Sequence, residues 1–124
     1  MSDYSVKVIE TSTELSKKDT IKLMDTTDSV ALDKATQDGE IVIDPFFWAV
    51  LEINNEKSQD KQYRNFIIQD KNGVKYRTGS ESFWRAFRSI WDALVDDDED
   101  WQINVYRLPS RNRQGKDFLT CSLV

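Results

Sequence analysis

The sequence predicts a mainly β fold with a single helix, and three observations carry this prediction. Short runs rich in aromatic and β-branched residues recur along the chain, separated by turn residues, as is typical of β domains. One amphipathic helix pattern interrupts these runs after the middle of the sequence. A tight hairpin leads directly into that helix, so residues 63–94 set a strand, strand, helix order around which the other elements are arranged.

The composition predicts a soluble globular protein in a reducing compartment. The chain has 124 residues, of which 39% are hydrophobic and 31% charged. No apolar run approaches the roughly 18 residues that a membrane span needs, and the first residues do not have the pattern of a secretory signal. Cys121 is the one cysteine, so no internal disulfide can form. We therefore expect a cytoplasmic protein that does not contact membranes.

The sequence contains no histidine, which removes the commonest general base and the commonest metal ligand. A glycine-rich phosphate loop, a cysteine pair and a nucleophile elbow are also absent from the sequence. The acidic run at residues 96–100 has no calcium-loop spacing, and it is interpreted as a solvated helix end. We expect neither an enzyme nor a bound cofactor or metal.

Residues 1–39 are acidic and weakly patterned, and they are interpreted as a poorly structured lead-in before a domain at residues 40–124. Within this lead-in, residues 4–9 alternate as a short strand does. Residues 21–24 are compatible with a strand and residues 30–35 with a helical turn.

The pattern sharpens from residue 40 onward. Residues 41–43 form one predicted strand piece and residues 46–53 a nearly continuous apolar strand, with Pro45 marking a bend or an edge. Alternation places Phe47 on one face of this strand and Trp48 on the other. A polar loop follows at residues 54–62.

The hairpin joins residues 63–70 to residues 74–78 through Lys71-Asn72-Gly73, which suits a type I turn closed by a left-handed glycine. This turn pairs Ile68 with Tyr76 and Phe66 with Thr78 on a face interpreted as core. The opposite face is then a mixed aromatic and basic platform that carries Tyr63, Asn65, Ile67, Gln69, Lys75 and Arg77.

The helix is predicted to begin after Ser80, a good N-cap, with Glu81 in its first turn. Its apolar stripe consists of Phe83, Phe87, Ile90, Trp91 and Leu94, and Trp84 lies off this stripe. Two further strands are predicted at residues 101–108 and 118–124. The basic loop between them, at residues 110–116, suits phosphate contacts.

From residue 40 the chain therefore has the order strand, strand, strand, helix, strand, strand. This is the order of the OB-fold, a five-stranded Greek-key barrel with its helix between strands 3 and 4, whose faces and loops bind oligonucleotides or oligosaccharides. The predicted fold class is thus an OB-fold-like barrel.

Three segments carry a resemblance: EINNEKSQDKQYRNFIIQDKNG at 52–73, YRTGSESFW at 76–84 and SRNRQGKDFLTC at 110–121. In these the chain resembles small single-stranded-DNA-binding proteins of phages and conjugative elements of Gram-positive bacteria. The resemblance covers residues 40–124, and the acidic lead-in departs from it. It implies a protein that coats single strands during replication or DNA transfer.

Single-strand binders stack bases on aromatic rings while basic side chains follow the phosphates. The expected stacking residues are Trp48, Tyr63 and Tyr106, and Asn65 and Gln69 are expected to bond base edges. The expected phosphate contacts are Arg64, Lys75, Arg77, Arg111, Arg113 and Lys116.

The net charge of −5 bears on the choice among the functions that we consider. Residues 1–45 carry ten acidic and five basic side chains, so the remainder of the chain is balanced and can still bind a polyanion. The first hypothesis is a single-strand binder of DNA or RNA with little sequence preference, which self-associates because one small domain covers few nucleotides. The alternatives are an acidic inhibitor or nucleic-acid mimic of the phage anti-defence type and an adaptor that binds only protein.

Overall fold

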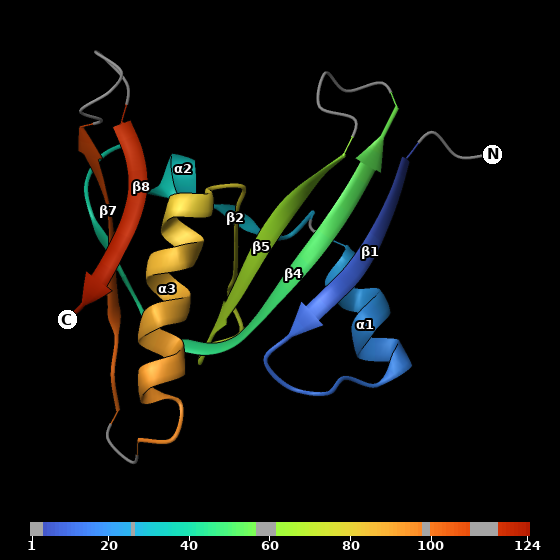
Figure 1. Ribbon diagram of the computed structural model, residues 1–124, viewed down its shortest axis with the longest axis horizontal. Coiled ribbons are helices and arrows are strands. Elements are labelled where there is room, and N and C mark those ends of the chain that lie inside the picture. Colours follow the sequence, from blue (N-terminus) through green and yellow to red (C-terminus); the bar gives the residue numbers. More distant parts are fainter. Residues whose placement is uncertain (1–3, 26, 57–61, 98–99, 110–116) are drawn as a thin grey trace. The chain divides into compact units, whose positions relative to one another are not determined.

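The computed structural model describes residues 4–25, 27–56, 62–97, 100–109 and 117–124. Over these residues the protein is an α+β fold with three helices and two open sheets, one of five strands and one of three. The predicted five-stranded barrel is wrong, because the described strands do not close on themselves and are divided between two sheets (Figure 1).

The chain divides into two compact units, each made of two segments. The first unit comprises Met1–Ala31 and Phe46–Gly79, and the second comprises Leu32–Pro45 and Ser80–Val124. The residues expected to form a weakly structured lead-in supply two strands and two helices.

The first unit contains the five-stranded sheet, in the order β1-β4-β5-β6-β2. β1 is antiparallel to β4, β5 is antiparallel to β6, and β2 is parallel to β6. The strands are β1 (Tyr4–Thr11), β2 (Val30–Ala31), β4 (Pro45–Asn55), β5 (Gln62–Asp70) and β6 (Lys75–Thr78).

The pairing of β1 explains why no barrel forms. β1 lies along β4 over its whole length, from Tyr4 opposite Asn55 to Thr11 opposite Ala49. β3 (Ile41–Ile43) instead pairs with β7 (Ile103–Pro109) in the other sheet. The bend predicted at Pro45 thus separates strands of two different sheets. The predicted strand order along the chain is largely right, but order alone does not determine which strands pair.

The β5–β6 hairpin has the predicted turn and register. The Asp70 N–H donates to the Val74 carbonyl at 2.9 Å, and Gly73 has a φ of +88°. Ile68 lies opposite Tyr76 and Gln69 lies opposite Lys75. The turn residues therefore predicted correctly which residues of this hairpin share a face.

Gly73 offers a direct test of this turn. An added Cβ at Gly73 would meet no atom within 4 Å. A side chain at this position would therefore destabilise the fold only through the left-handed backbone conformation. We expect Gly73→Ala to lower the free energy of unfolding by about 1 kcal/mol in urea titrations. Gly79→Ala is the matched control, because Gly79 has no positive φ, and it should change stability by less than about 0.5 kcal/mol. Equal effects of the two substitutions would contradict the turn assignment.

The helix α1 (Lys17–Met24) begins at Ser16, whose Oγ accepts from the Asp19 N–H at 3.1 Å. A strand at residues 21–24 was therefore the wrong prediction, because this cap and the apolar spacing fold the run as a helix. The buried Leu23 packs in a core with Phe47, Ala49, Leu51 and Ile67. This core lies on the face of the sheet that had been interpreted as the exposed platform.

The second unit contains the three-stranded antiparallel sheet, in the order β3-β7-β8, with β8 at Asp117–Leu123. The helix α3 (Glu81–Leu94) lies along β8, and the Ser82 Oγ donates to the Leu119 carbonyl at 3.0 Å (Figure 1). The short helix α2 (Leu32–Ala35) also belongs to this unit.

The start of α3 is as predicted, since the Ser80 Oγ accepts from the Phe83 N–H at 3.2 Å. Phe83 and Phe87 are fully buried, in agreement with the predicted apolar stripe. Trp84 was placed off that stripe and is also buried, with its ring centroid 5.2 Å from that of Phe87. The buried face of α3 is therefore wider than its sequence spacing indicated.

Candidate nucleic-acid interface

The hairpin brings two of the predicted site residues together. Gln69, near the end of β5, lies directly opposite Lys75 at the start of β6. The Lys75 Nζ donates to the Lys22 carbonyl at 3.4 Å, so this end of the hairpin reaches α1. Both side chains are half-buried.

A pocket of about 390 Å³ opens at this position, and we call it the α1 pocket. Every residue that lines it belongs to the first unit. Its polar lining residues are Thr13, Asp19, Lys22, Gln69 and Lys75. Its apolar lining residues are Leu15, Leu23, Phe46 and Phe47.

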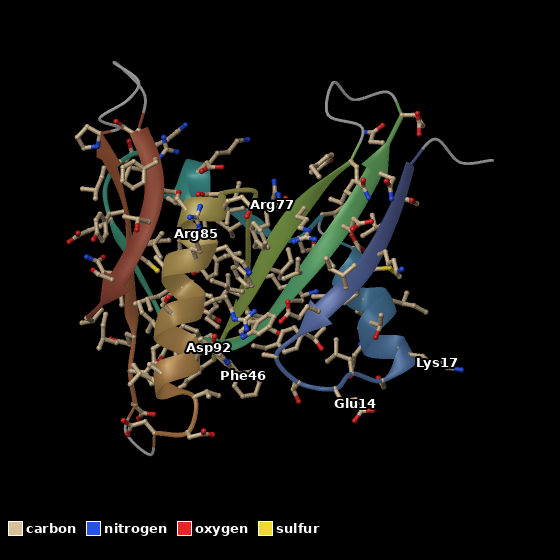
Figure 2. The ribbon with its side chains drawn as sticks, viewed as in Figure 1. Glu14, Lys17, Phe46, Arg77, Arg85 and Asp92 are labelled. Atoms are coloured by element: carbon tan, nitrogen blue, oxygen red, sulfur yellow. The ribbon has the colours of Figure 1, made fainter. Side chains whose placement is uncertain are left out.

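Phe46 is the functional candidate that the sequence analysis missed. It lines the α1 pocket and is 66% exposed, whereas its neighbour Phe47 is buried in the core. Figure 2 shows the Phe46 ring projecting outward from β4. The signal was present in the sequence, because two consecutive phenylalanines in one strand must point to opposite faces. Such a large exposed ring is unusual for a residue that is normally buried.

The residues that line the α1 pocket include more cations than anions. Lys22 and Lys75 contribute two positive charges and Asp19 one negative charge. Lys75 also acts on a neighbouring carboxyl group: hydrogen bonds from Thr27 lower the pKa of Asp25, and the attraction of Lys75 lowers it further. Lys75 therefore stabilises the ionised carboxylate of Asp25 at the C-terminal end of α1.

Arg77 is engaged within the first unit. Its Nη1 donates to the Ser29 carbonyl at 2.6 Å and is 2.9 Å from the Ser29 Oγ. These bonds tie β6 to the segment before β2. The guanidinium therefore stabilises the sheet edge in this structure, and its role in phosphate binding stays a prediction.

Tyr63, Arg64 and Asn65 lie toward the other end of β5. Tyr63 is 37% exposed and Arg64 is exposed. Between this group and Gln69 lies Ile67, which is 1% exposed in the core under α1. The predicted platform is therefore not continuous. The buried Ile67 separates Tyr63 and Asn65 at one end of β5 from Gln69 at the other end.

Trp48 is 3% exposed, so its ring presents no free face for stacking in this structure. Its backbone N–H donates to the Ser12 Oγ at 3.0 Å, and its carbonyl accepts from the Ser12 N–H at 2.9 Å. These bonds fix the segment after β1 to β4. The alternation around Trp48 was predicted correctly, but both faces of β4 are buried at this point.

Tyr106 lies on β7 and thus in the second unit. It lines a separate open pocket with Arg107, whose Nε donates to the Thr36 Oγ1 at 3.1 Å and whose Nη2 donates to the Asp33 carbonyl. Arg111, Arg113 and Lys116 lie outside the described residues, so their predicted contacts with phosphate stay predictions.

The net negative charge belongs entirely to the second unit. The first unit contains ten acidic and ten basic residues, whereas the second contains twelve acidic and seven basic residues. The objection that a chain of net charge −5 repels a polyanion therefore does not apply to the unit that contains the α1 pocket.

Three further observations concern the described part of the chain. No group of three or more cysteine, aspartate or glutamate residues there could hold a metal ion. Burial raises the pKa of the Cys121 thiol to about 12, so this side chain is a poor nucleophile at neutral pH. Along the described ranges, no helix has the length and apolar character that crossing a membrane requires.

Comparisons with known proteins assign no family to the chain, so its function is inferred from the geometry of the site. No protein-family model, curated protein or solved structure matches the chain.

Proposed function

We propose that this protein binds single-stranded DNA through the α1 pocket of its first unit. The observation that carries the proposal is that Phe46, which is 66% exposed, lines the same pocket as Lys22 and Lys75. A stacking surface next to cations that can follow the phosphates is the combination that single-strand binders use. Gln69 adds an amide that can donate to and accept from a base edge.

The mechanism is stoichiometric binding without turnover. One base stacks on Phe46, and the flanking phosphates pair with the two lysines. Paired bases of duplex DNA are already stacked on each other, so an unpaired strand is the preferred ligand. Coating of single strands during replication or transfer, the function expected from the sequence, is kept as part of this proposal.

One pocket of this size covers few nucleotides, so useful affinity requires several protomers on one strand. Self-association along the DNA supplies it, because each further protomer then binds at a high effective concentration. Cooperative binding to long oligonucleotides is therefore part of the proposal.

The salt dependence of binding tests the proposal. We expect fluorescently labelled oligo(dT) to bind at low salt and to lose affinity as salt rises, with a slope of log K against log salt of about −1.4 or steeper, for two phosphates neutralised. Unlabelled single strands should compete and duplexes should compete poorly. Oligo(rU) shows in the same titration whether RNA is also bound. Absence of binding to any oligonucleotide at low salt would contradict the proposal.

The excess of acidic residues in the second unit favours a second candidate, a nucleic-acid mimic that binds a basic protein surface. Asp96, Asp97 and Asp100 are exposed after α3. The same titration separates the two functions, since a mimic ignores DNA at every salt concentration.

A further inference from the structure

The polar lining of the α1 pocket matches one nucleobase better than the other three. We infer that the pocket prefers guanine, an inference that rests on the proposed binding of single strands. Its volume of about 390 Å³ is at the lower end of the range of ligand sites and suits a single base.

The pocket places an acceptor and several donors around one opening. Asp19 and Lys22 are three residues apart on α1 and therefore lie on the same side of the helix. Lys75 and Gln69 are opposite each other on the hairpin. The backbone N–H of Asp19 is bound by the Ser16 cap, so Asp19 adds only its carboxylate to the pocket.

Guanine offers the complementary edge. Its N1–H and its 2-amino group are two adjacent donors, and an ionised carboxylate can accept both in a bidentate, charge-assisted pair. Its O6 and N7 are acceptors, to which the amide N–H groups of Gln69 can donate. With the base in the pocket, Asp19 can pair with the two donors and Gln69 with the acceptors, while Lys22 and Lys75 are left for the flanking phosphates.

The other bases place an acceptor against the carboxylate. Adenine and cytosine each have one amino group beside a ring nitrogen that only accepts, and thymine has one N–H between two carbonyl oxygens. An ionised Asp19 repels these acceptor atoms. The carboxylate thus disfavours the wrong bases as well as favouring guanine, which is how specificity commonly arises.

The test uses the full chain and a series of dT oligonucleotides with one central substitution. We expect the oligonucleotide with guanine to bind about tenfold more tightly than those with adenine, cytosine or thymine. Inosine, which lacks the 2-amino group, should have intermediate affinity. Asp19→Asn should reduce the preference to less than about twofold and should raise the affinity for plain oligo(dT), because the carboxamide loses one acceptor and no longer repels the thymine carbonyl oxygens or the phosphates.

Glu14→Gln is the matched control, since Glu14 is an exposed acid of the same unit that does not line the pocket (Figure 2). It should keep the full preference for guanine. Equal affinity for all four bases, or a preference that survives Asp19→Asn, would overturn the inference and leave single-strand binding intact. Failure to bind any of the oligonucleotides would instead overturn the proposed function.

Discussion

Phe87→Ala is expected to lower the free energy of unfolding by about 3–5 kcal/mol. The Phe87 side chain is 0% exposed, and its ring contacts three other aromatic rings of α3. Their centroids lie 6.1 Å away for Phe83, 5.2 Å for Trp84 and 6.0 Å for Trp91. Truncation leaves a cavity among rings that cannot all move into it. Since domains are stable by only about 5–15 kcal/mol, this variant should be partly unfolded at 37 °C.

Urea unfolding followed by tryptophan fluorescence measures this loss. Arg85→Ala is the control on the same helix, because Arg85 is exposed and alanine is at least as good a helix former (Figure 2). The control should change stability by less than about 0.5 kcal/mol. A cost below about 1 kcal/mol for Phe87→Ala would show that α3 is not packed as described.

Phe46→Ala should have the opposite profile, with a large effect on binding and a small one on stability. A base stacked on an aromatic ring contributes about 1–3 kcal/mol, so the affinity for oligo(dT) should fall roughly 5- to 150-fold. Because the ring is 66% exposed, its loss should hardly change the urea midpoint. Fluorescence anisotropy with labelled oligo(dT) at low salt gives the affinity.

The matched control for this experiment is Phe118→Ala. Phe118 is also an exposed phenylalanine, but it lies on β8 in the second unit and does not line the α1 pocket. Its replacement should leave the affinity for oligo(dT) within about twofold of the wild type. If both variants lose affinity equally, the effect does not come from stacking at the α1 pocket.

Local signals in the sequence predicted much of the secondary structure. The hairpin followed from Lys71-Asn72-Gly73, because the turn requires a left-handed residue and Gly73 supplies it. The helix α3 followed from Ser80 and the apolar stripe after it. These features are encoded within a few residues of each other, so they can be recognised without knowing the tertiary fold.

The pairing of strands that lie far apart in the sequence could not be recognised from such local signals. β1 pairs with β4 across 38 to 51 residues, and β3 pairs with β7 across 60 to 64 residues. A strand pattern indicates which face is apolar but does not name the partner strand. The barrel prediction assumed a pairing from the order of elements, and that assumption was wrong.

The candidate site was predictable in part for the same reason. Gln69 and Lys75 were placed together correctly, because the turn fixes their register. Alternation separated Phe46 from Phe47, but which of the two rings stays exposed followed only from the placement of β4 and α1. Trp48 was expected to be exposed because it lies on the face of β4 opposite Phe47. It is only 3% exposed, because that face of β4 is covered as well.

Photo-crosslinking most directly tests the central claim that a base stacks on Phe46 in the α1 pocket. An oligo(dT) with a single 5-iododeoxyuridine is irradiated with the full-length protein, and the adduct is located by peptide mass spectrometry. We expect the adduct at Phe46. An adduct confined to the second unit, for example at Tyr106 or Phe118, or no adduct at saturating protein, would contradict the proposed interface.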